Sequence, residues 1–257
     1  MRIVKIGGRA QGDVRLGPAL AGAARAAGSA AASLCVVHGG GDEVSALQRL
    51  YGADSQFKGG RRVTTQLDLE IIRMALSGSA NKRLVSALIS SGVPALGLSG
   101  EDGALLSAAP LDVSQYGFVG SPAAVNVGLL RHLMAGGYLP VISPVSRGID
   151  ASPSMVLNVN GDDAAAHIAV ALDADELLLV SDVAGVLVDG APVSMLGPDD
   201  AQRMIDQGTA HGGMGAKLQA ALAALEGGVE RVRISDIAAI EHLDRGTLLT
   251  RVGSVCA

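Results

Sequence analysis

The sequence predicts an α/β protein with a mostly parallel central sheet and helices on both faces. Short segments rich in valine, isoleucine and leucine alternate with longer segments whose apolar residues recur at helical spacing. Glycines gather where these segments end, which is typical of tight strand-to-helix turns. A chain of 257 residues is long enough to bury a large core, as one domain or two.

The first predicted strand, residues 2–6, ends in Gly7-Gly8, and the second, residues 34–37, ends in His38-Gly39-Gly40-Gly41. Residues 105–119, broken by Pro110 and Gly117, predict a small antiparallel flap. Further strands are predicted at 95–98, 138–142, 155–157, 177–180 and 232–234, the last of which would end the sheet. Helices are predicted at 19–27, from 42 to 51, and at 69–77, 84–89, 129–135, 164–172, 199–207 and 217–225.

Composition and charge exclude several classes of protein. The formal net charge is -5 and no basic run occurs, which argues against nucleic acid as a partner. No apolar stretch has the length needed to cross a bilayer, and Met1 is followed at once by the first strand, which leaves no signal peptide. Only two cysteines occur, Cys35 and Cys256, so we expect a reduced cytoplasmic protein without a disulfide or a metal site.

Each of the two strand-to-glycine loops could cradle an anion. Glycine lets the backbone approach a phosphate closely, and the free N–H groups at the start of the helix that follows point toward it. Lys5 interrupts the first apolar strand, and a buried lysine needs an anion to meet. Neither loop has the Gly-Lys-Ser/Thr of a P-loop. The pair predicts a polyphosphate site at the carboxyl ends of parallel strands.

Three further segments carry polar groups next to helices. Residues 158–163 read Asn-Val-Asn-Gly-Asp-Asp, in which Asp162 or Asp163 could be simply a helix N-cap. Lys217 follows a glycine-rich turn and could be an exposed helix residue, although a carboxylate such as Asp162 could hold both Lys5 and Lys217. Of Arg61 and Arg62, the sequence leaves open which one points inward.

Six motifs in order resemble those of the amino acid kinase family, and most closely its members that phosphorylate N-acetyl-L-glutamate. The resemblance runs from Met1 to near the carboxyl end with compatible spacing. The motifs are Lys5-Ile6-Gly7-Gly8, Val37-His38-Gly39-Gly40-Gly41, Gly60-Arg61-Arg62-Val63-Thr64, the Gly97–Gly103 segment, Asn158-Val159-Asn160-Gly161-Asp162 and the Ser181–Leu187 segment.

The resemblance implies a three-layer αβα sandwich with an open sheet, in which residues 1–172 bind the amino acid and dimerise and residues 173–257 bind ATP. Lys5 and Lys217 would stabilise the transition state, and Asp162 would orient them. The residues implied in binding the amino acid are Gly40, Gly41, Arg62, Asn158 and Asn160, with Arg62 holding the α-carboxylate. Gly40 and Gly41 would also meet the transferring phosphoryl group. Those implied in binding the nucleotide are Gly7, Gly8, Ser181, Asp182, Val183, Ala184, Gly185, Val186, Thr209, Ala210, His211 and Met214. Gly212-Gly213 replaces the Asp-Gly often seen in the family, which puts the nucleotide contacts of that loop in doubt.

The implied reaction is ATP-dependent phosphorylation of the side-chain carboxylate of N-acetyl-L-glutamate, a step of arginine biosynthesis. Mg²⁺ would be held mainly through the phosphates of ATP, because the sequence shows no dedicated carboxylate cage. One alternative is a related kinase acting on carrier-linked or N-acylated aminoadipate in lysine biosynthesis. Another is a non-catalytic sensor with the same fold, which would be expected to lack Lys5, Lys217 or Asp162.

The segment Glu70–Leu76 predicts a homodimer. Ile71 and Ile72 are adjacent on a helix and are not expected to face the same core, so one of them would meet a partner. The resemblance also places this helix at a two-fold interface. Relatives inhibited by arginine carry an additional N-terminal helix, for which the sequence before the first strand leaves no room, so we expect little inhibition by arginine.

Overall fold

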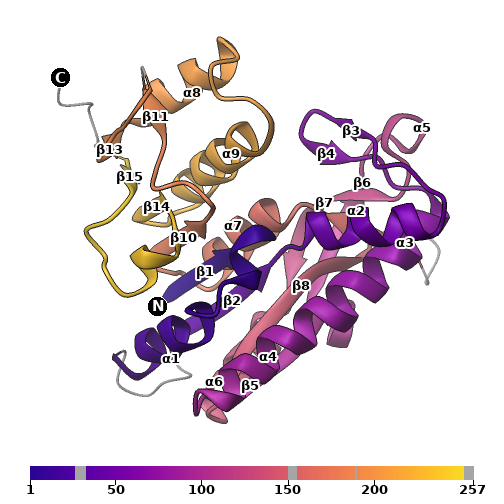
Figure 1. The fold of residues 1–257 in the computed structure, drawn as a ribbon, viewed down its shortest axis with the longest axis horizontal. Coiled ribbons are helices and arrows are strands. Elements are labelled where there is room, and N and C mark those ends of the chain that lie inside the picture. The colour runs from indigo at the N-terminus through magenta and orange to yellow at the C-terminus, as the bar shows by residue number, and fades with distance from the viewer. Residues whose placement is uncertain (27–32, 150–154, 189, 252–257) are drawn as a thin grey trace.

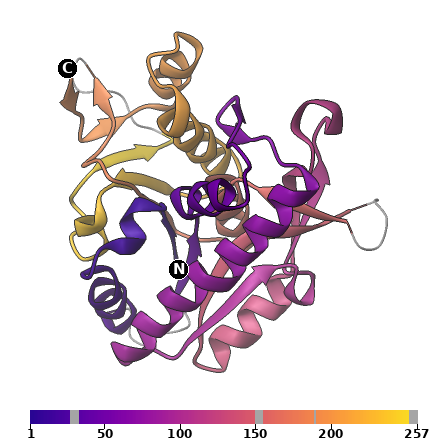
Figure 2. The same ribbon diagram turned by 45° about the vertical axis from the view of Figure 1, so that its right-hand side comes forward.

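The computed structural model describes residues 1–26, 33–149, 155–188 and 190–251. A twisted central sheet runs through the molecule with helices on both faces (Figures 1 and 2). This arrangement confirms the predicted α/β class and the three-layer sandwich. The end of the predicted helix 19–27 and Cys256 lie outside the described residues. No helix of the described ranges is long and apolar enough to cross a membrane.

The sheet is mixed but mostly parallel, as predicted. Its strands, with two small hairpins, are β1 (Arg2–Ile6), β2 (Leu34–His38), β3 (Phe57–Lys58), β4 (Arg61–Arg62), β5 (Ala95–Gly100), β6 (Leu106–Pro110), β7 (Val119–Val125), β8 (Leu139–Gly148), β9 (Val156–Val159), β10 (Glu176–Val180), β11 (Leu187–Val188), β12 (Ala191–Pro192), β13 (Met195–Leu196), β14 (Arg231–Ser235) and β15 (Thr247–Thr250). Across the main sheet the order is β13-β15-β14-β10-β1-β2-β8-β6-β7-β9, with β5 also paired to β8. β1 therefore lies near the centre, in parallel register with both β2 and β10.

Helices cover both faces of this sheet (Figure 1). The α-helices are α1 (Leu16–Ala26), α2 (Gly41–Leu50), α3 (Gln66–Ile72), α4 (Asn81–Ser90), α5 (Val113–Tyr116), α6 (Val127–Ala135), α7 (Gly161–Ala171), α8 (Pro198–Asp206) and α9 (Gly212–Glu226). The short helical segments η1 (Arg9–Gly12), η3 (Asp102–Ala104) and η4 (Ile237–Ile240) are 3-10 turns, and η2 (Arg73–Ala80) is a π-helix.

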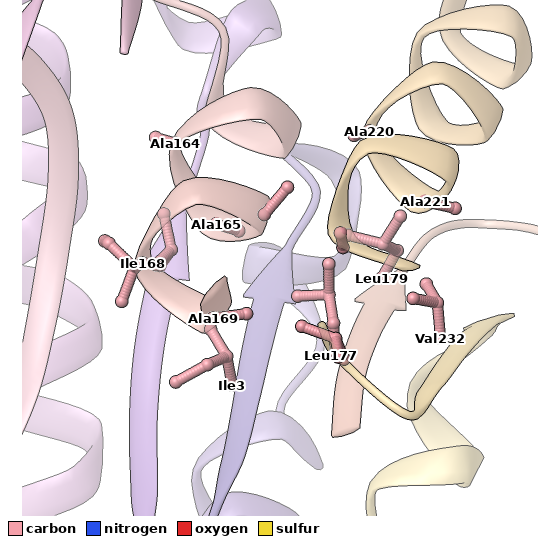
Figure 3. Close-up of a cluster of buried hydrophobic side chains, with 14 of the residues drawn as sticks. Ile3, Ala164, Ala165, Ile168, Ala169, Leu177, Leu179, Ala220, Ala221 and Val232 are labelled. Carbon is pink, nitrogen blue, oxygen red and sulfur yellow. The ribbon is translucent and has the colours of Figure 1, made fainter. Parts of the chain in front are cut away.

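Alternation along the central strands divides the core between the two faces. Ile3, Leu177 and Leu179 pack against α7 and α9, where alanines such as Ala165 and Ala221 let the helices approach closely (Figure 3). Residues of the opposite parity, such as Val4, pack against α1 and α4. Because successive side chains point to opposite faces, Lys5 lies on the same face as Ile3, beneath α7.

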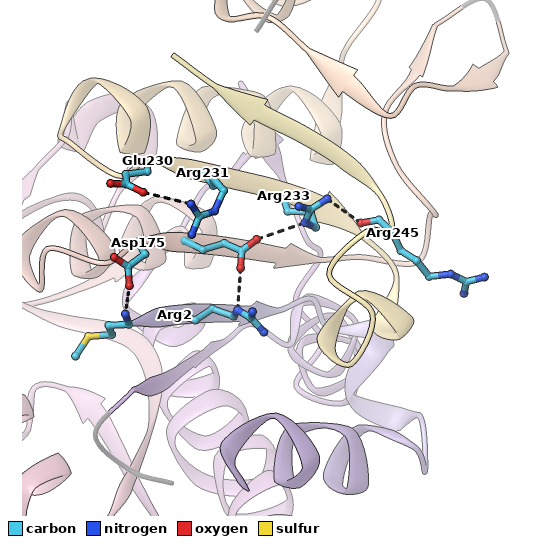
Figure 4. A network of polar contacts seen from close by, with 8 residues as sticks. Arg2, Asp175, Glu230, Arg231, Arg233 and Arg245 are labelled. Atoms are coloured by element: carbon cyan, nitrogen blue, oxygen red, sulfur yellow. Dashed lines mark hydrogen bonds and ion pairs between the residues drawn. The ribbon is translucent and has the colours of Figure 1, made fainter. Parts of the chain in front are cut away.

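A polar network ties the amino ends of the central strands together (Figure 4). The buried carboxylate of Glu176 on β10 accepts from Arg2 Nε on β1 at 2.9 Å and lies 3.4 Å from Arg233 Nε on β14. The Met1 ammonium also pairs with Asp175. Removing Glu176 would leave two partly buried guanidinium groups without their anion, so we regard this end of the sheet as structural.

One long helical run replaces two separate predicted helices, and it corrects the argument for a dimer. α3, η2 and α4 follow one another from Gln66 to Ser90 without a break. Ile71 and Ile72 are both buried within one subunit, in a cluster with Val44 of α2, Val145 of β8 and Val156 of β9. The helix is covered from two sides, so the expectation that one of the two isoleucines needs a partner is wrong.

The edges of the sheet also differ from expectation. β6 and β7 are antiparallel as predicted, but β6 also pairs with β8, so they extend the main sheet instead of forming a separate flap. The sheet does not end at residues 232–234, because β15 pairs antiparallel with β14 and β13 adds to β15. Cys35 is a buried core residue, and burial raises the pKa of its thiol to about 12.

Candidate active site

Three charged side chains from distant parts of the chain meet at the carboxyl end of the central strands. Asp162 Oδ1 lies 2.9 Å from Lys5 Nζ, and Asp162 Oδ2 lies 3.6 Å from Lys217 Nζ. All three side chains are buried or nearly so. The pairing that the sequence left open as one possibility for Asp162 is therefore present, and neither lysine is an ordinary surface residue.

Asp162 is positioned by the first turn of α7. The Asn160 side chain caps this helix, with Oδ1 accepting from the backbone N–H of Asp162 at 2.8 Å and of Asp163 at 3.4 Å. The alternative in which Asp162 or Asp163 is the N-cap is therefore wrong. Because Asn160 provides the cap, the Asp162 carboxylate is free to turn toward the lysines.

Lys217 reaches the same point from α9. The glycine-rich segment before it is not a separate turn, because α9 begins at Gly212 and takes Gly213 and Gly215 into its first turn. A Cβ at Gly215 would lie 2.9 Å from the Ala210 carbonyl oxygen, so this close approach requires glycine. α9 packs along α7, which brings Lys217 beside Asp162.

The charges of the lysines decide the ionisation of Asp162. Burial by itself would raise the pKa of this carboxyl, but Lys5 and Lys217 outweigh burial and hold the pKa below its usual value. Burial lowers the pKa of Lys217, and the Asp162 charge opposes that shift. With Asp162 ionised and the lysines charged, the cluster carries a net positive charge to offer an anion.

The two glycine loops lie against each other beside this cluster. A Cβ at Gly8 would lie 3.2 Å from Gly41 N and 3.3 Å from Gly40 Cα. At Gly161, a Cβ would lie 3.2 Å from Lys5 Cε. Gly40 has φ of +155° and packs on Leu76, whose Cδ2 would be 2.6 Å from an added Cβ. Side chains at these positions would fill the space next to the lysines, as expected of a phosphate cradle.

A cleft of about 400 Å³ opens from these loops between β1, β10 and α9. Nine of the predicted site residues line it: Lys5, Gly7, Gly8, Gly41, Ser181, Asp182, Val183, Met214 and Lys217. Arg9, which the sequence analysis missed, adds a cation, pairing with Asp182 and lying 3.7 Å from Asp42. A larger cavity of about 530 Å³ lies at the opposite end of the strands, beside Arg2 and Glu176 and far from the lysines.

Some residues predicted to bind nucleotide have other contacts. The Val186 N–H donates to Thr247 Oγ1 at 2.8 Å, and a Cβ at Gly185 would meet the same hydroxyl. Ala210 is buried beneath the start of α9. Ala184, Thr209 and His211 do not line the cleft either. The contact of these six residues with a nucleotide stays a prediction.

Arg62 is the inward-pointing arginine of its pair. It lies in β4 of a small hairpin rather than in an irregular loop, and its side chain is buried against α2. Nη2 donates to Gly41 O and to Ser45 Oγ, both at 3.0 Å, while Nη1 donates to Gln48 Oε1 and Ser55 Oγ. Burial lowers the pKa of Arg62, and Asp68 and Asp42 oppose that shift.

Two hydrogen bonds through Thr64 link the hairpin to Asn158. Asn158 Nδ2 donates to Thr64 Oγ1 at 3.0 Å, and Thr64 Oγ1 donates to Arg62 O at 2.8 Å. Arg61 turns the other way, and its Nη1 lies 2.5 Å from Asp163 Oδ2 at the start of α7. Arg62 and Asn158, both predicted to bind the amino acid, therefore lie on one connected surface that ends at Gly41.

Several residues of this surface were missed by the sequence analysis. Ser45 and Gln48 lie one turn apart on α2, directly after the glycine loop, and that spacing was the available signal. Ser55 carried no signal in the sequence. Thr64 stood in the Gly60–Thr64 motif, but its contacts with Arg62 O and Asn158 were not predicted. Among the described residues, no group of three or more histidine, cysteine, aspartate or glutamate side chains could hold a metal ion.

The arrangement of these side chains suits a reaction between negatively charged molecules. The two lysines line a glycine-lined cleft with an additional arginine, Arg9. The buried Arg62, which meets this cleft at Gly41, and Asn158 could hold a small carboxylate. Within the described part of the chain, the carboxylate at the centre, Asp162, is paired with both lysines and is not set up as a nucleophile. The cluster therefore favours a reaction between two bound anions, in which the protein supplies positive charge and alignment.

Comparison with known proteins agrees with this chemistry. The amino acid kinase family matches residues 1–236. The chain is 40% identical over 232 residues to the acetylglutamate kinase of Geobacillus stearothermophilus, covering 90% of this chain and 88% of that protein. It is 45% identical over 201 residues to the acetylglutamate kinase of Rubrobacter xylanophilus, covering 78% of this chain and 77% of that protein.

A solved structure extends the likeness to the fold. The crystal structure of smu.665 from Streptococcus mutans UA159 superposes with a TM-score of 0.86 at 27% identity, covering 97% of this chain and 98% of that one. Insertions and deletions between the two chains are therefore small relative to the common fold.

Proposed function

The chain belongs to the amino acid kinase family, and we propose that it transfers the γ-phosphoryl group of ATP to the side-chain carboxylate of N-acetyl-L-glutamate. The product is N-acetyl-L-glutamyl 5-phosphate, an acyl phosphate of arginine biosynthesis. The observation that supports this function best is the Lys5–Asp162–Lys217 cluster, whose two lysines line the glycine-lined cleft.

The reaction needs positive charge more than it needs a base. A glutamate side chain has a pKa of about 4.3, so the attacking carboxylate is already ionised near neutral pH. One of its oxygens forms a bond to the γ-phosphorus while the bond from that phosphorus to the β,γ-bridging oxygen breaks and ADP leaves. Lys5 and Lys217 would stabilise the charge on the transferring group, and Asp162 would hold the two ammonium groups in place.

The two substrates would enter from opposite sides of the cluster. Gly7, Gly8 and the Ser181–Val183 segment would border the phosphates of ATP, with Arg9 nearby. Arg62 would hold the α-carboxylate of N-acetyl-L-glutamate, and Asn158 and Asn160 would lie beside it. Four N–H groups of Arg62 already have protein partners, so a carboxylate would add to its Nε or displace a hydroxyl. The Asn160 oxygen is committed to the cap of α7, so its amide would be the group free for substrate.

Mg²⁺ would be held mainly by the phosphates of ATP. The described residues offer no cluster of carboxylates for a protein cage, which fits the usual preference of Mg²⁺ for phosphate and water oxygens. When bound, the ion supplies further neutralisation of phosphate charge. The chain's own residues would still have to align the carboxylate and the γ-phosphoryl group.

A panel of acceptors tests the function. Purified protein with ATP and Mg²⁺ is given N-acetyl-L-glutamate, N-acetyl-L-aminoadipate, N-succinyl-L-glutamate or glutamate, and hydroxylamine traps any acyl phosphate as a hydroxamate. We expect the hydroxamate with N-acetyl-L-glutamate at the highest kcat/KM. Preferred turnover of the aminoadipate compound would instead assign the chain to the related kinases, and no hydroxamate with any acceptor would leave the sensor alternative.

We also propose that the two parts of the chain bind different substrates and that the protein forms a homodimer. Residues 1–172 would bind the amino acid and residues 173–257 the nucleotide, although Gly7, Gly8 and Arg9 of the first part line the nucleotide cleft.

Support for a dimer comes from Leu67 and Met74, which are about half exposed and lie two turns apart on the helical run from Gln66 to Ser90. Light scattering of the wild type and of Met74→Glu tests it, with Val113→Glu on α5 as the matched exposed control. A monomeric wild type would refute the dimer.

A further inference from the structure

The peptide group between Gly39 and Gly40 is held by two side chains from outside the glycine loop. Its carbonyl oxygen accepts from Gln11 Nε2 at 2.5 Å and lies 2.9 Å from His38 Nδ1. The Gly39 N–H in turn donates to Ile6 O at 3.0 Å. In a trans peptide the C=O and the N–H point in opposite directions, so fixing the Gly39 oxygen also fixes the direction of the Gly40 N–H.

The Gly40 N–H has no protein acceptor within the described residues. Gly40 immediately precedes α2, and its neighbour Gly41 lines the cleft with Lys5 and Lys217. The contact of Gly8 with Gly40 and Gly41 places both loops around the same space. An N–H without a partner at the start of a helix, beside two lysines, is a donor prepared for a phosphoryl oxygen.

The surroundings of His38 fix which ring nitrogen carries the proton. Its side chain is fully buried, and Nε2 lies 3.1 Å from Asn81 Nδ2, which also donates to Val141 O at 2.9 Å and lies 3.4 Å from Leu98 O. An amide nitrogen donates hydrogen bonds and does not accept them. Lys82 Nζ donates to Asn81 Oδ1, which agrees with the amide orientation. His38 Nε2 must therefore accept, and the proton on Nδ1 is donated to Gly39 O.

Burial keeps this tautomer neutral. It lowers the pKa of His38 to about 4, although the hydrogen bond to Gly39 and the charge of Glu43 act in the opposite direction. The charges of Lys5 and Arg83 lower the pKa further. Near neutral pH the ring therefore has one donor and one acceptor, as the two contacts require. The other donor, Gln11, lies in η1, which directly follows the first glycine loop. From there its side-chain amide reaches the Gly39 carbonyl oxygen.

We propose that Gln11 and His38 are positioning residues that clamp the Gly39–Gly40 peptide so that the Gly40 N–H faces the transferring phosphoryl group. The inference rests on the proposed function and deepens it. Neither residue touches the substrate. They act through a backbone donor that is useful only if it is already aligned when charge develops in the transition state.

Paired variants of Gln11 separate hydrogen bonding from packing. Gln11→Met keeps the length of the side chain and loses the donor, and Gln11→Glu keeps the shape and places a carboxylate oxygen against the carbonyl. We expect kcat to fall on the order of tenfold in Gln11→Met and further in Gln11→Glu, with KM for both substrates little changed. Gln202→Met and Gln202→Glu, on the exposed face of α8, are the matched controls.

His38 is tested by where a replacement amide can place its donor. His38→Asn keeps an N–H near the Nδ1 position, and His38→Gln moves it to the Nε2 position, so His38→Asn should retain more of kcat. If both variants fail to fold, the Gln11 pair still decides the proposal. Binding of ADP with aluminium fluoride and N-acetyl-L-glutamate should weaken with kcat, whereas binding of a non-hydrolysable ATP analogue should not.

The outcomes distinguish the clamp from the function on which it rests. Formation of the hydroxamate by the wild type together with wild-type kcat in Gln11→Glu would overturn the clamp and leave the function standing. If kcat fell in Gln11→Met but not in the shape-matched Gln11→Glu, the effect of Gln11 would come from packing and not from its hydrogen bond. That result would also overturn the clamp. Failure of the wild type to form any acyl phosphate would overturn both.

Discussion

Asp162 Oδ1 lies 2.9 Å from Lys5 Nζ, and both side chains are less than one-tenth exposed. A buried ion pair usually gains little net stability, because desolvation of the two charges offsets their attraction. Here a second lysine, Lys217, leaves the cluster with an excess positive charge next to the glycine loops. The cluster is better explained by the anion it would stabilise than by the stability of the fold.

Lys217→Ala should lower kcat on the order of a hundredfold or more, because it removes one prealigned charge from the transferring phosphoryl group. Asp162 keeps Lys5 as a partner, so we expect little change in the melting temperature measured by circular dichroism. Lys5→Ala should lower kcat similarly. Lys58→Ala, on the exposed hairpin strand β3, is the control. Near-wild-type turnover in Lys217→Ala would remove this lysine from the mechanism.

Asp162→Asn should move the alkaline limb of the kcat profile to lower pH. Burial lowers the pKa of Lys217, and the Asp162 charge opposes that shift, so removing the charge lowers the pKa further. Lys217 acts only while protonated, and activity is lost as pH rises through its pKa. The measurement is kcat against pH by a coupled ADP assay. Asp163→Asn, one residue along α7, should leave the limb in place, and an unshifted limb in Asp162→Asn would refute this electrostatic role.

Arg62→Ala should raise KM for the amino acid on the order of tenfold or more, with a smaller effect on kcat, because its carboxylate partner is unchanged through the reaction. It should also lower the melting temperature, since Gln48 and Ser45 lose a buried donor. Arg61→Ala is the matched comparison, because this neighbour pairs with Asp163 and not with the substrate surface. A larger KM effect in Arg61→Ala would exchange the two assignments.

Gly8→Ala should reduce kcat/KM for ATP strongly, because the new methyl group would lie 3.2 Å from Gly41 N and push the two loops apart. Gly12→Ala, a few residues along, is the control, since nothing lies within 4 Å of the position that its new methyl group would take. Steady-state kinetics with varied ATP compares the two. Equal effects would mean that the close approach of the loops is unimportant for the nucleotide.

The sequence predicted the central strands well, because they follow from local patterns. The meeting of Asp162 and Lys217 with Lys5 was only one of the possibilities that the residues left open, and their roles came from the resemblance to the family. β1 and β2 are apolar runs that end in glycine, and Lys5 is conspicuous within such a run. The predicted boundaries failed where long-range contacts decide. Helices were predicted separately at 69–77 and 84–89, yet the helical run is continuous between them and η2 packs on β8. The cap at Asn160, the partners of Arg62 and the reach of Gln11 to Gly39 depend on neighbours that no spacing in the sequence reveals.

The position of β1 between β2 and β10 has a consequence for biosynthesis. The ribosome makes β1 long before β10, so one edge of β1 stays unpaired until β10 emerges, and Lys5 meets Lys217 only after the chain from β1 to α9 has been made. At about 5–20 residues per second, that interval lasts roughly 10 s or more. A nascent or truncated chain that stops before β10 exposes an apolar strand edge, which makes it a target for chaperones and a seed for aggregation. Premature termination of translation therefore yields an aggregation-prone fragment rather than a partly active enzyme.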